Sequence, residues 1–536
     1  MCKYIFVTGG VCSSLGKGIA TASIGALLKA SGLKVFTQKL DPYLNVDPGT
    51  MSPFQHGEVF VTDDGGETDL DLGHYERFID TNLNKLSSVT TGKIYSEVLD
   101  KERKGSFLGR TIQIIPHITN AIQDKITEAA SEAKCDVMMC EIGGTVGDIE
   151  GLPFYEAIRQ MRYRLGEKNV LFIHLTLLPY LKASKELKTK PTQASVRELR
   201  SIGVQPDFIL TRADMPIKKD LLKKVALFCD VDEKCVIPAQ TVESIYEVPQ
   251  NFEKYKMTEL IAEKLNLGKL HPQLAEWKTL VKKIKAKKTT LKIGMVGKYT
   301  HLEDAYISVI ESLKIACYHQ NRDLKVIWIS SEGLEEKDKK VWADLRSVNG
   351  MVVPGGFGIR GTEGKIMAAK YAREHRIPYL GLCLGMQIMT IEFARHALKN
   401  EKITSEEFDE DNKMGEENHI IHFLPGQSCD RAKGGTLRLG SYPCKIKKGT
   451  LTHKLYGKDL VEERHRHRYE FNNDYKDMLE KAGMIFSGIN PKQNLVEIAE
   501  IADHPFMVGS QFHPEFKSRP NRPHPLFKGF IQAAKK

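Results

Sequence analysis

The sequence predicts an α/β fold built from two three-layer α/β domains, the first with a mostly parallel sheet. Two observations lead to this prediction. Short apolar runs alternate with amphipathic helical stretches over residues 1–270, a pattern typical of parallel sheets covered by helices. The same alternation restarts at residue 291, after a lysine-rich stretch. We therefore expect domains at 1–270 and 291–536, joined by a linker at 271–290.

The individual elements follow this order. An apolar run at 4–8 predicts the first buried strand, and residues 19–30 predict the helix after it. Further apolar runs predict the other strands, at 34–37, 135–140, 170–175 and 208–210 in the first domain and at 291–297, 325–329, 350–353 and 379–381 in the second. The segment at 409–426, acidic at its start, is typical of a long loop or insertion.

Composition excludes several classes of protein. With 41% hydrophobic and 27% charged residues among 536, the chain is neither disordered nor fibrous in character. No apolar run reaches the roughly 18 residues that a membrane-spanning helix needs, so we expect no membrane partner. Ten scattered cysteines without a CxxC pair favour a reducing, cytoplasmic setting over a disulfide-bonded one.

The net charge of +10 raises the question of nucleic-acid binding. Seven lysines and no acidic residue lie between Lys278 and Lys292, and leaving them out reduces the excess to 10 − 7 = +3. This stretch lacks the interleaved aromatic residues that stack on bases, and such runs are usually solvated. We therefore expect no nucleic-acid partner.

A glycine-rich loop follows the first predicted strand. It runs from Gly9 to Gly18, with Lys17 near its end, and leads into the first predicted helix. Glycines let backbone N–H groups approach phosphate oxygens, while the helix N-terminus and the lysine add positive charge. The loop departs from the standard P-loop twice, because Gly10 lies one residue too far from Gly16 and Gly18 replaces the Ser or Thr that would bind Mg²⁺. The loop predicts a nucleotide site; the alternative is a glycine-rich turn that binds nothing.

Two acidic residues are candidates for binding Mg²⁺ without that hydroxyl. Glu141 directly follows an apolar strand, at the strand end where α/β sheets bind ligands, and Asp71 lies in the acidic segment 68–73. Mg²⁺ takes carboxylates together with substrate phosphates. Each residue alone would more often be a surface or capping residue, so this prediction depends on the nucleotide site.

A second basic cluster lies at residues 185–193, where lysines alternate with hydroxyl and amide side chains. This mixture suits a polyanion that carries a polar base, although a solvated charge run is the alternative. Lys224 lies nearby in the sequence.

A cysteine lies at a sharp strand–helix turn in the second predicted domain. Residues 381–385 read Gly-Leu-Cys-Leu-Gly, and the small residues allow a turn that lifts the Cys383 thiol out of the sheet, next to a helix N-terminus that favours a thiolate. His513 and Glu515 can act as the general base and its orienting carboxylate. The backbone N–H groups of 354–358 and of Leu384 can stabilise an oxyanion. These elements resemble the triad-type class I glutamine amidotransferases, with Cys383, His513 and Glu515 in the catalytic roles.

The chain as a whole resembles the CTP synthase family. The matching stretches are 4–19, 38–51, 141–150, 188–193, 354–361, 381–387, 463–469 and 513–516, and the match covers about 3–530. The family shares both departures of the glycine-rich loop. The resemblance implies an N-terminal P-loop-type amidoligase domain and a C-terminal class I glutamine amidotransferase domain. It also implies a ligase in which ATP phosphorylates O4 of UTP and ammonia from L-glutamine then displaces phosphate to give CTP.

The resemblance assigns roles to individual residues. ATP would be bound by Ser14, Leu15, Gly16, Lys17, Gly18, Ile19, Asp71, Arg212 and Val242. Lys17 and Lys39 would stabilise the transferred phosphoryl group, and Asp71 and Glu141 would bind Mg²⁺. UTP or CTP would be bound by Ser13, Asp148, Ile149, Glu150, Lys188, Thr189, Lys190, Pro191, Thr192, Gln193 and Lys224. Glutamine would be bound by Gly356, Leu384, Gly385, Met386, Gln387, Glu407 and Arg468. A homotetramer, activation by GTP and feedback inhibition by CTP are further implications.

Other functions fit part of the pattern. Another amide-forming P-loop synthetase with a fused glutaminase, such as a corrinoid amidase, would typically lack the His513–Glu515 pair and would not need residues 188–193. A basic nucleotide-binding regulator would leave Cys383 structural, and the turn together with His513 and Glu515 argues against that. A filament-forming role is compatible with the enzyme and is not decided by the sequence.

Overall fold

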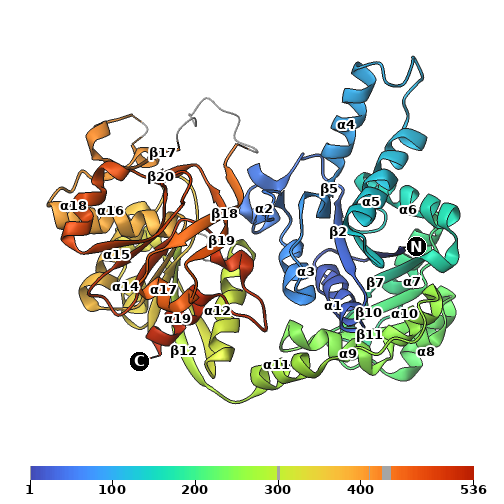
Figure 1. Cartoon of the computed structure of the whole chain (residues 1–536). Coiled ribbons are helices and arrows are strands. Elements are labelled where there is room, and N and C mark those ends of the chain that lie inside the picture. The colour runs from blue at the N-terminus through green and yellow to red at the C-terminus, as the bar shows by residue number, and fades with distance from the viewer. Residues whose placement is uncertain (1, 299–301, 410, 425–435, 536) are drawn as a thin grey trace. The chain divides into compact units, whose positions relative to one another are not determined.

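The computed structural model describes residues 2–298, 302–409, 411–424 and 436–535 (Figure 1). The chain divides into two compact units. Unit 1 comprises Met1–Pro48 and Asp71–Ile284, and unit 2 comprises Gly49–Leu70 and Lys285–Lys536. Residues 49–70, which lie inside the first predicted domain in sequence order, therefore group with unit 2. The loop expected at 409–426 lies partly outside the described residues, and the boundaries 1–270, 271–290 and 291–536 stay a prediction.

Unit 1 is built on a parallel sheet, as the sequence predicts. Its strand order is β11-β10-β7-β1-β6-β2-β5, and every neighbouring pair is parallel. The strands are β1 (Lys3–Gly9), β2 (Val35–Asp41), β5 (Ser88–Thr90), β6 (Val137–Ile142), β7 (Val170–Leu177), β10 (Phe208–Ala213) and β11 (Val236–Gln240). Consecutive residues of β2 and β6 are buried, so both faces of the sheet are covered. The carboxyl ends of β1, β2 and β6 lie side by side, where parallel sheets bind ligands.

Helices connect these strands. They are α1 (Lys17–Ala30), α3 (Asp71–Ile79), α4 (Thr91–Arg103), α5 (Thr119–Ala133), α6 (Leu152–Leu165), α7 (Lys190–Ser201), α8 (Lys219–Cys229), α9 (Val248–Lys254), α10 (Met257–Leu265) and α11 (Ala275–Lys285). Helix α1 packs against α3, and α7 and α8 pack over β10 through Val196, Leu222 and Val225. A small hairpin, β8 (Tyr180–Leu181) and β9 (Glu186–Leu187), precedes α7. Figure 1 shows α4 and α5 extending away from the sheet.

Unit 2 contains a mixed sheet with the order β13-β12-β14-β15-β23-β22-β21-β18-β19. The first five strands pair in parallel and the remainder pair antiparallel. The strands are β12 (Thr289–Gly297), β13 (Arg322–Ser330), β14 (Gly350–Val353), β15 (Tyr379–Leu382), β18 (Arg438–Ile446), β19 (Leu460–His467), β21 (Met484–Ile489), β22 (Val496–Ile501) and β23 (Met507–Ser510). A smaller sheet joins β16 (Thr404–Ser405), β17 (His419–Phe423) and β20 (Tyr469–Phe471), and β3 (Phe60–Val61) pairs with β4 (Glu67–Thr68).

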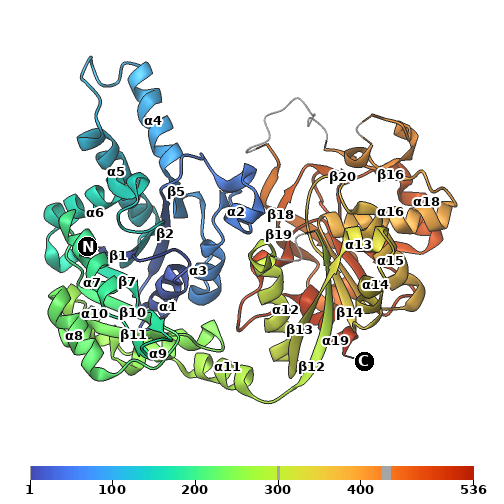
Figure 2. The same cartoon turned by 180° about the vertical axis from the view of Figure 1, so that it is seen from behind.

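Helices cover both faces of this large sheet, which makes unit 2 a three-layer α/β structure as predicted. One face carries α12 (Ile307–His319), α17 (Leu451–Tyr456) and α19 (Pro525–Ala534); the other carries α13 (Ser331–Glu335), α14 (Lys339–Arg346), α15 (Thr362–His375), α16 (Leu384–Leu398) and α18 (Lys476–Ala482). Strand β14 shows the alternation, because Met351 and Val353 pack toward α15 and α16 while Val352 packs toward α12 and α19. Figure 2 shows α12 and α16 on opposite sides of the sheet. Helix α2 (Pro53–His56) lies in the 49–70 segment. In the described residues, no helix combines the length and apolarity needed to cross a bilayer.

Candidate active sites

The glycine-rich loop of unit 1 links the carboxyl end of β1 to α1. Gly16 adopts φ 89°, in the left-handed region that favours glycine, and α1 begins at the next residue, Lys17. A Cβ at Gly10 would lie 1.6 Å from Ser195 Oγ, so glycine is required there for close packing against α7. The loop residues Ser13, Ser14 and Leu15 are exposed or half-buried. This geometry is that of a phosphate-binding turn at a helix N-terminus.

Four residues that the sequence singled out converge beside this loop. Lys39 of β2 forms ion pairs with Asp71 at the start of α3 and with Glu141 of β6, the latter at 2.8 Å between Nζ and Oε1. Lys17 Nζ donates a hydrogen bond of 2.7 Å to the carbonyl of Gly144. Two lysines and two carboxylates thus lie at the adjoining strand ends of β2 and β6, which suits a phosphoryl group with its counterions.

Burial dominates the electrostatics of this cluster. It lowers the pKa of Lys17, although the charge of Glu141 opposes the shift. It raises the pKa of Glu141, and the charge of Lys39 opposes that shift. Tyr75 of α3, which no sequence motif singled out, donates a hydrogen bond of 2.5 Å to Glu141 Oε2. The carboxylate of Glu141 is therefore held in place from two sides.

The residues expected around the uridine nucleotide lie at the beginning of α7 and near it. Thr189 and Thr192 are buried, and Thr192 Oγ1 donates 3.0 Å to the carbonyl of Leu177. Lys188 pairs with Glu186, and Lys190 lies over the ring of Phe228. Pro191 and Gln193 occupy the first turn of α7, and Lys224 is exposed on α8.

The remaining predicted nucleotide contacts lie on separate segments of unit 1. Asp148 Oδ2 accepts hydrogen bonds from the backbone and hydroxyl of Thr145, at 2.7 and 2.9 Å, and Ile149 and Glu150 are exposed beside it. Arg212 of β10 donates 3.3 Å to the carbonyl of Ala239, and Val242 follows β11. Their ligand contacts stay predictions.

One hydrogen-bonded relay at the loop was missed in the sequence. Thr8 Oγ1 lies 2.8 Å from His174 Nδ1, and His174 Nε2 lies 2.9 Å from Ser195 Oγ. Burial, with a further contribution from Lys17, lowers the pKa of His174 to about 3, so this imidazole is neutral. A single histidine inside the apolar run at 170–175 has no spacing that would have revealed it.

In unit 2, Cys383 lies at the tip of the turn between β15 and α16. Its φ of 51° and ψ of −103° are strained for a residue with a side chain, as at other nucleophile elbows. The backbone N–H of Cys383 donates 2.7 Å to the carbonyl of Ser510 on the neighbouring strand β23. A Cβ at Gly385 would lie 2.0 Å from the carbonyl oxygen of Val353, which explains why the turn requires glycine there.

The structure brings together the three predicted catalytic residues. His513 Nδ1 lies 2.7 Å from Glu515 Oε1, and both side chains are buried. A Cβ at Gly355 would lie 2.9 Å from His513 Cε1 and 3.6 Å from Cys383 Cβ, so the glycine-rich segment contacts both residues. Burial lowers the pKa of His513, but the charges of Glu515 and Cys383 outweigh it and raise the pKa to about 10. His513 is therefore placed to exchange a proton with the neighbouring thiol.

A cavity of about 1260 Å³ opens onto this triad, and its lining includes Cys383, His513, Gly356, Glu407 and Arg468. Glu407 Oε1 accepts 2.7 Å from the N–H of Gly358, and burial raises the pKa of its carboxyl. Opposite charges at Glu407 and Arg468 suit the amino and carboxylate groups of a free amino acid.

The first turn of α16 contains the other predicted glutamine contacts, Leu384, Gly385, Met386 and Gln387, all buried. Gln387 Nε2 donates 3.2 Å to Gln511 Oε1, and Gln511 Nε2 donates 3.6 Å to Cys383 Sγ. Gln511 was missed as a site residue, although it lies two positions before His513.

Segment 49–70 also contacts the elements around the triad within unit 2. Arg464 Nε and Asp63 Oδ1 are 2.6 Å apart, and Arg466 Nε and Glu67 Oε1 are 2.9 Å apart. In the sequence, the only signal for these pairs is that the two segments carry opposite charges. Opposite charges on segments about 400 residues apart do not show which residues pair.

Comparison with known proteins identifies the family to which each half of the chain is similar. Residues 3–267 match the family model described as CTP synthase N-terminus, and residues 301–533 match glutamine amidotransferase class-I. A protein named CTP synthase from Dehalococcoides mccartyi (strain ATCC BAA-2266 / KCTC 15142 / 195) is 58% identical over 536 residues, which cover 100% of this chain and 97% of that protein. The CTP synthase of Bacillus subtilis (strain 168) is 57% identical over 535 residues, 100% of this chain and 99% of that protein.

Among solved structures, a Trypanosoma brucei CTPS glutaminase domain with bound acivicin is 36% identical to this chain. It matches 46% of this chain and 94% of its own, with a TM-score of 0.42. The two relatives named CTP synthase match the whole chain, and the two family models match its N-terminal and C-terminal halves. On that evidence, the chain belongs to the CTP synthase family.

Proposed function

We propose that the protein makes CTP from UTP, with ATP as the phosphoryl donor and L-glutamine as the source of ammonia. One observation supports this best: a single chain contains both the Cys383–His513–Glu515 triad and the Lys17, Lys39, Asp71 and Glu141 cluster. The triad suits ammonia release from an amide, and the cluster suits phosphoryl transfer.

In the glutaminase half-reaction, His513 takes the thiol proton and Glu515 stabilises the resulting imidazolium. The Cys383 thiolate attacks the carboxamide of glutamine, and the backbone N–H groups of Gly356 and Leu384 stabilise the oxyanion. His513 then gives its proton to the departing ammonia, and water hydrolyses the thioester to release glutamate. Glu407 and Arg468 bind the amino and carboxylate groups of glutamine.

In the synthetase half-reaction, residues 14–19 bind the ATP phosphates, with Arg212 and Val242 near the adenine. Ser13, residues 188–193 and Lys224 bind UTP, and 148–150 contact the pyrimidine of the product CTP. Lys17 and Lys39 neutralise charge on the γ-phosphoryl group as it moves to O4 of UTP. Ammonia then attacks C4 and phosphate leaves, so nitrogen replaces the original oxygen.

Asp71 and Glu141 would hold Mg²⁺ in this reaction. In the described residues, no cluster of three or more His, Cys, Asp or Glu would bind a metal by itself. Mg²⁺ typically uses one or two carboxylates and completes its shell with water and substrate phosphates, so the two carboxylates around Lys39 fit it. When bound, the ion neutralises phosphate charge during the transfer.

We also propose, from the family resemblance, a cytoplasmic homotetramer that is activated by GTP and inhibited by CTP. Size-exclusion chromatography tests the tetramer, and rates of CTP formation measured with added GTP or CTP test the activation and the inhibition.

The function is tested by incubating the protein with UTP, ATP, Mg²⁺ and either glutamine or ammonium, and following CTP by chromatography. CTP should form from both nitrogen sources. Lys17→Ala should remove both activities, because activation of UTP precedes both, while glutamate release from glutamine continues. Full ammonia-dependent CTP formation by this variant would contradict the role given to Lys17, and no CTP from the unaltered protein would contradict the function.

A further inference from the structure

Strand β19 presents two different faces along the sequence Arg464-His465-Arg466-His467. The arginine side chains at 464 and 466 pair with Asp63 and Glu67 of the 49–70 segment. The imidazoles of His465 and His467 point the other way and are 0% and 1% exposed. This alternation follows from the two-residue period of a strand. The histidine face therefore serves the interior of unit 2.

The backbone of β19 contacts the catalytic residues directly. The carbonyl of Arg464 accepts a hydrogen bond of 2.7 Å from the N–H of His513. The carbonyl of Arg466 lies 3.8 Å from Cys383 Sγ and accepts from the thiol. A displacement of β19 would therefore move both carbonyl acceptors, the one that holds His513 and the one that holds Cys383.

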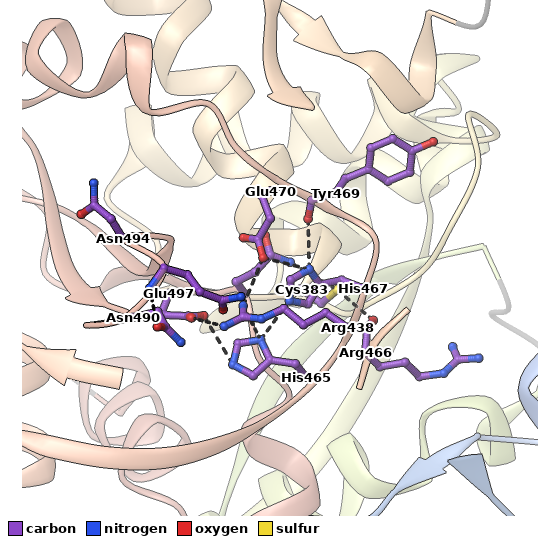
Figure 3. A network of polar contacts seen from close by, with 12 residues as sticks. Cys383, Arg438, His465, Arg466, His467, Tyr469, Glu470, Asn490, Asn494 and Glu497 are labelled. Atoms are coloured by element: carbon purple, nitrogen blue, oxygen red, sulfur yellow. Dashed lines mark hydrogen bonds and ion pairs between the residues drawn. The ribbon is translucent and has the colours of Figure 1, made fainter. Parts of the chain in front are cut away.

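The two imidazoles belong to a buried chain of polar contacts with acceptors at both ends (Figure 3). His467 Nδ1 lies 3.1 Å from the carbonyl oxygen of Tyr469. His467 Nε2 lies 2.9 Å from His465 Nδ1. His465 Nε2 lies 3.4 Å from Glu497 Oε2. Among the described residues, neither His465 Nε2 nor Glu497 Oε2 has a hydrogen-bond partner, so a proton placed between these two buried atoms would satisfy both.

Counting hydrogens along this chain shows that it is one proton short if both imidazoles are neutral. The carbonyl of Tyr469 and the carboxylate of Glu497 only accept, so a hydrogen bond at each of the three contacts would need one proton from an imidazole. Two neutral imidazoles carry two protons. Two lone pairs would then face each other at one contact, at a cost that burial makes large.

The net charge of the groups around the two imidazoles also calls for one additional proton. The groups that face the imidazoles are Arg438 of β18, Glu470 of β20, Glu497 of β22 and, beyond them, His513. Arg438 Nη1 lies 3.1 Å from Glu470 Oε1, and Nη2 lies 2.8 Å from Glu497 Oε1. One arginine and two carboxylates sum to −1, and one further proton makes the buried group neutral.

The pKa directions agree with a proton held near Glu497. Burial and Arg438 lower the pKa values of both His465 and His467. Burial raises the pKa of Glu497, although Arg438 opposes the shift, and burial together with Glu497 raises the pKa of Glu470. The buried carboxyls therefore retain a proton more readily than carboxyls in water.

We propose that His465 and His467 are positioning residues for glutamine hydrolysis, and that one proton shared along the chain from Tyr469 to Glu497 holds β19 against Cys383 and His513. The role rests on the proposed function, since it concerns only the glutaminase half-reaction. Neither imidazole contacts the reacting atoms.

The decisive experiment replaces the shared, exchangeable proton by an amide hydrogen that does not depend on protonation. In Glu497→Gln the amide oxygen can still accept from Arg438, and the amide N–H can donate to His465 Nε2 without an extra proton. Glutamate release by this variant should stay close to that of the unaltered protein. A fall of about 10-fold or more in Glu497→Gln, with ammonia-dependent CTP formation retained, would overturn the proposal, because Glu497 would then be needed as an anion.

A second variant tests the imidazoles themselves. His465→Phe keeps a ring of similar size but removes two of the three contacts, and its kcat for glutamine should fall about 10- to 100-fold. The KM for glutamine should change much less, because His465 is not among the described residues that line the cavity. His453→Asn is the matched control. His453 also belongs to unit 2 and pairs with Asp459 at 2.9 Å, but it takes no part in the contacts from Tyr469 to Glu497. Its replacement should leave glutamate release unchanged.

Denaturant unfolding followed by circular dichroism checks the folding of unit 2 in each variant, and ammonia-dependent CTP formation serves as the reference for the site in unit 1. An unchanged kcat for glutamine in His465→Phe would overturn the positioning role. If His465→Phe does not fold, Glu497→Gln still decides. Absence of CTP formation by the unaltered protein would instead contradict the proposed function, while glutamate release would continue to test this inference.

Discussion

The carboxylate of Asp71 fills the space that a side chain at Gly18, in the first turn of α1, would need: a Cβ at Gly18 would lie 1.9 Å from Asp71 Oδ1. Asp71 in turn pairs with Lys39, which pairs with Glu141. The standard P-loop has Ser or Thr at this position, and here the carboxylate of another helix takes its place. Glycine at position 18, which departs from the standard P-loop, is therefore required for Asp71 to reach Lys39.

Gly18→Ala should displace the Asp71 carboxylate and disturb its pair with Lys39. We expect CTP formation from glutamine and from ammonia to fall together by about 10- to 100-fold, because both need activated UTP. Glutamate release without nucleotides should continue, which controls for the folding of unit 2. Normal ammonia-dependent activity in this variant would show that Asp71 has room to adapt.

Cys383→Ala should abolish glutamine-dependent CTP formation, because the thiol is the nucleophile. Ammonia-dependent CTP formation should survive, since added ammonia bypasses glutamine hydrolysis. The two rates are measured by chromatography on the same preparation. Loss of both rates in a folded variant would contradict the division of labour between the two sites.

Glu515→Gln should shift the pH dependence of glutamate release. The charge of Glu515 is the largest influence that raises the pKa of His513 to about 10, so its loss moves that pKa toward the ordinary value of 6.5. His513 must hold a proton to release ammonia, and activity falls as the pH rises through its pKa. The alkaline limb of the kcat profile should therefore begin at lower pH in the variant. An unmoved limb would show that another group controls it.

Gly385→Ala should destabilise unit 2, because its Cβ would lie 2.0 Å from the carbonyl oxygen of Val353. A backbone oxygen cannot yield as a flexible side chain does, and we expect a loss of about 1–3 kcal/mol, measured by denaturant unfolding. Gly356→Ala provides the control, because the nearest atom to its Cβ would be Leu384 Cδ2 at 3.4 Å, an ordinary contact. Equal stability of the two variants would contradict the packing argument.

The local pattern of the sequence determined the α/β fold, the strands that lead to Lys17, Glu141 and Cys383, and the chemistry of these groups. Such features follow from short-range rules: apolar period, turn-forming glycines and residues that stand together at a strand end. His513 and Glu515 were found because they stand two residues apart and complete the elbow.

Only the tertiary structure decided which distant groups share a proton or a charge. The relay from Thr8 through His174 to Ser195, the pairing of Tyr75 with Glu141, and the chain from Tyr469 to Glu497 each join side chains from separate strands or helices. Residues 49–70 likewise grouped with unit 2, although sequence order sets them among unit 1 elements. Long-range pairing depends on where the backbone carries each side chain, and an isolated histidine or charge in the sequence carries no record of its partner.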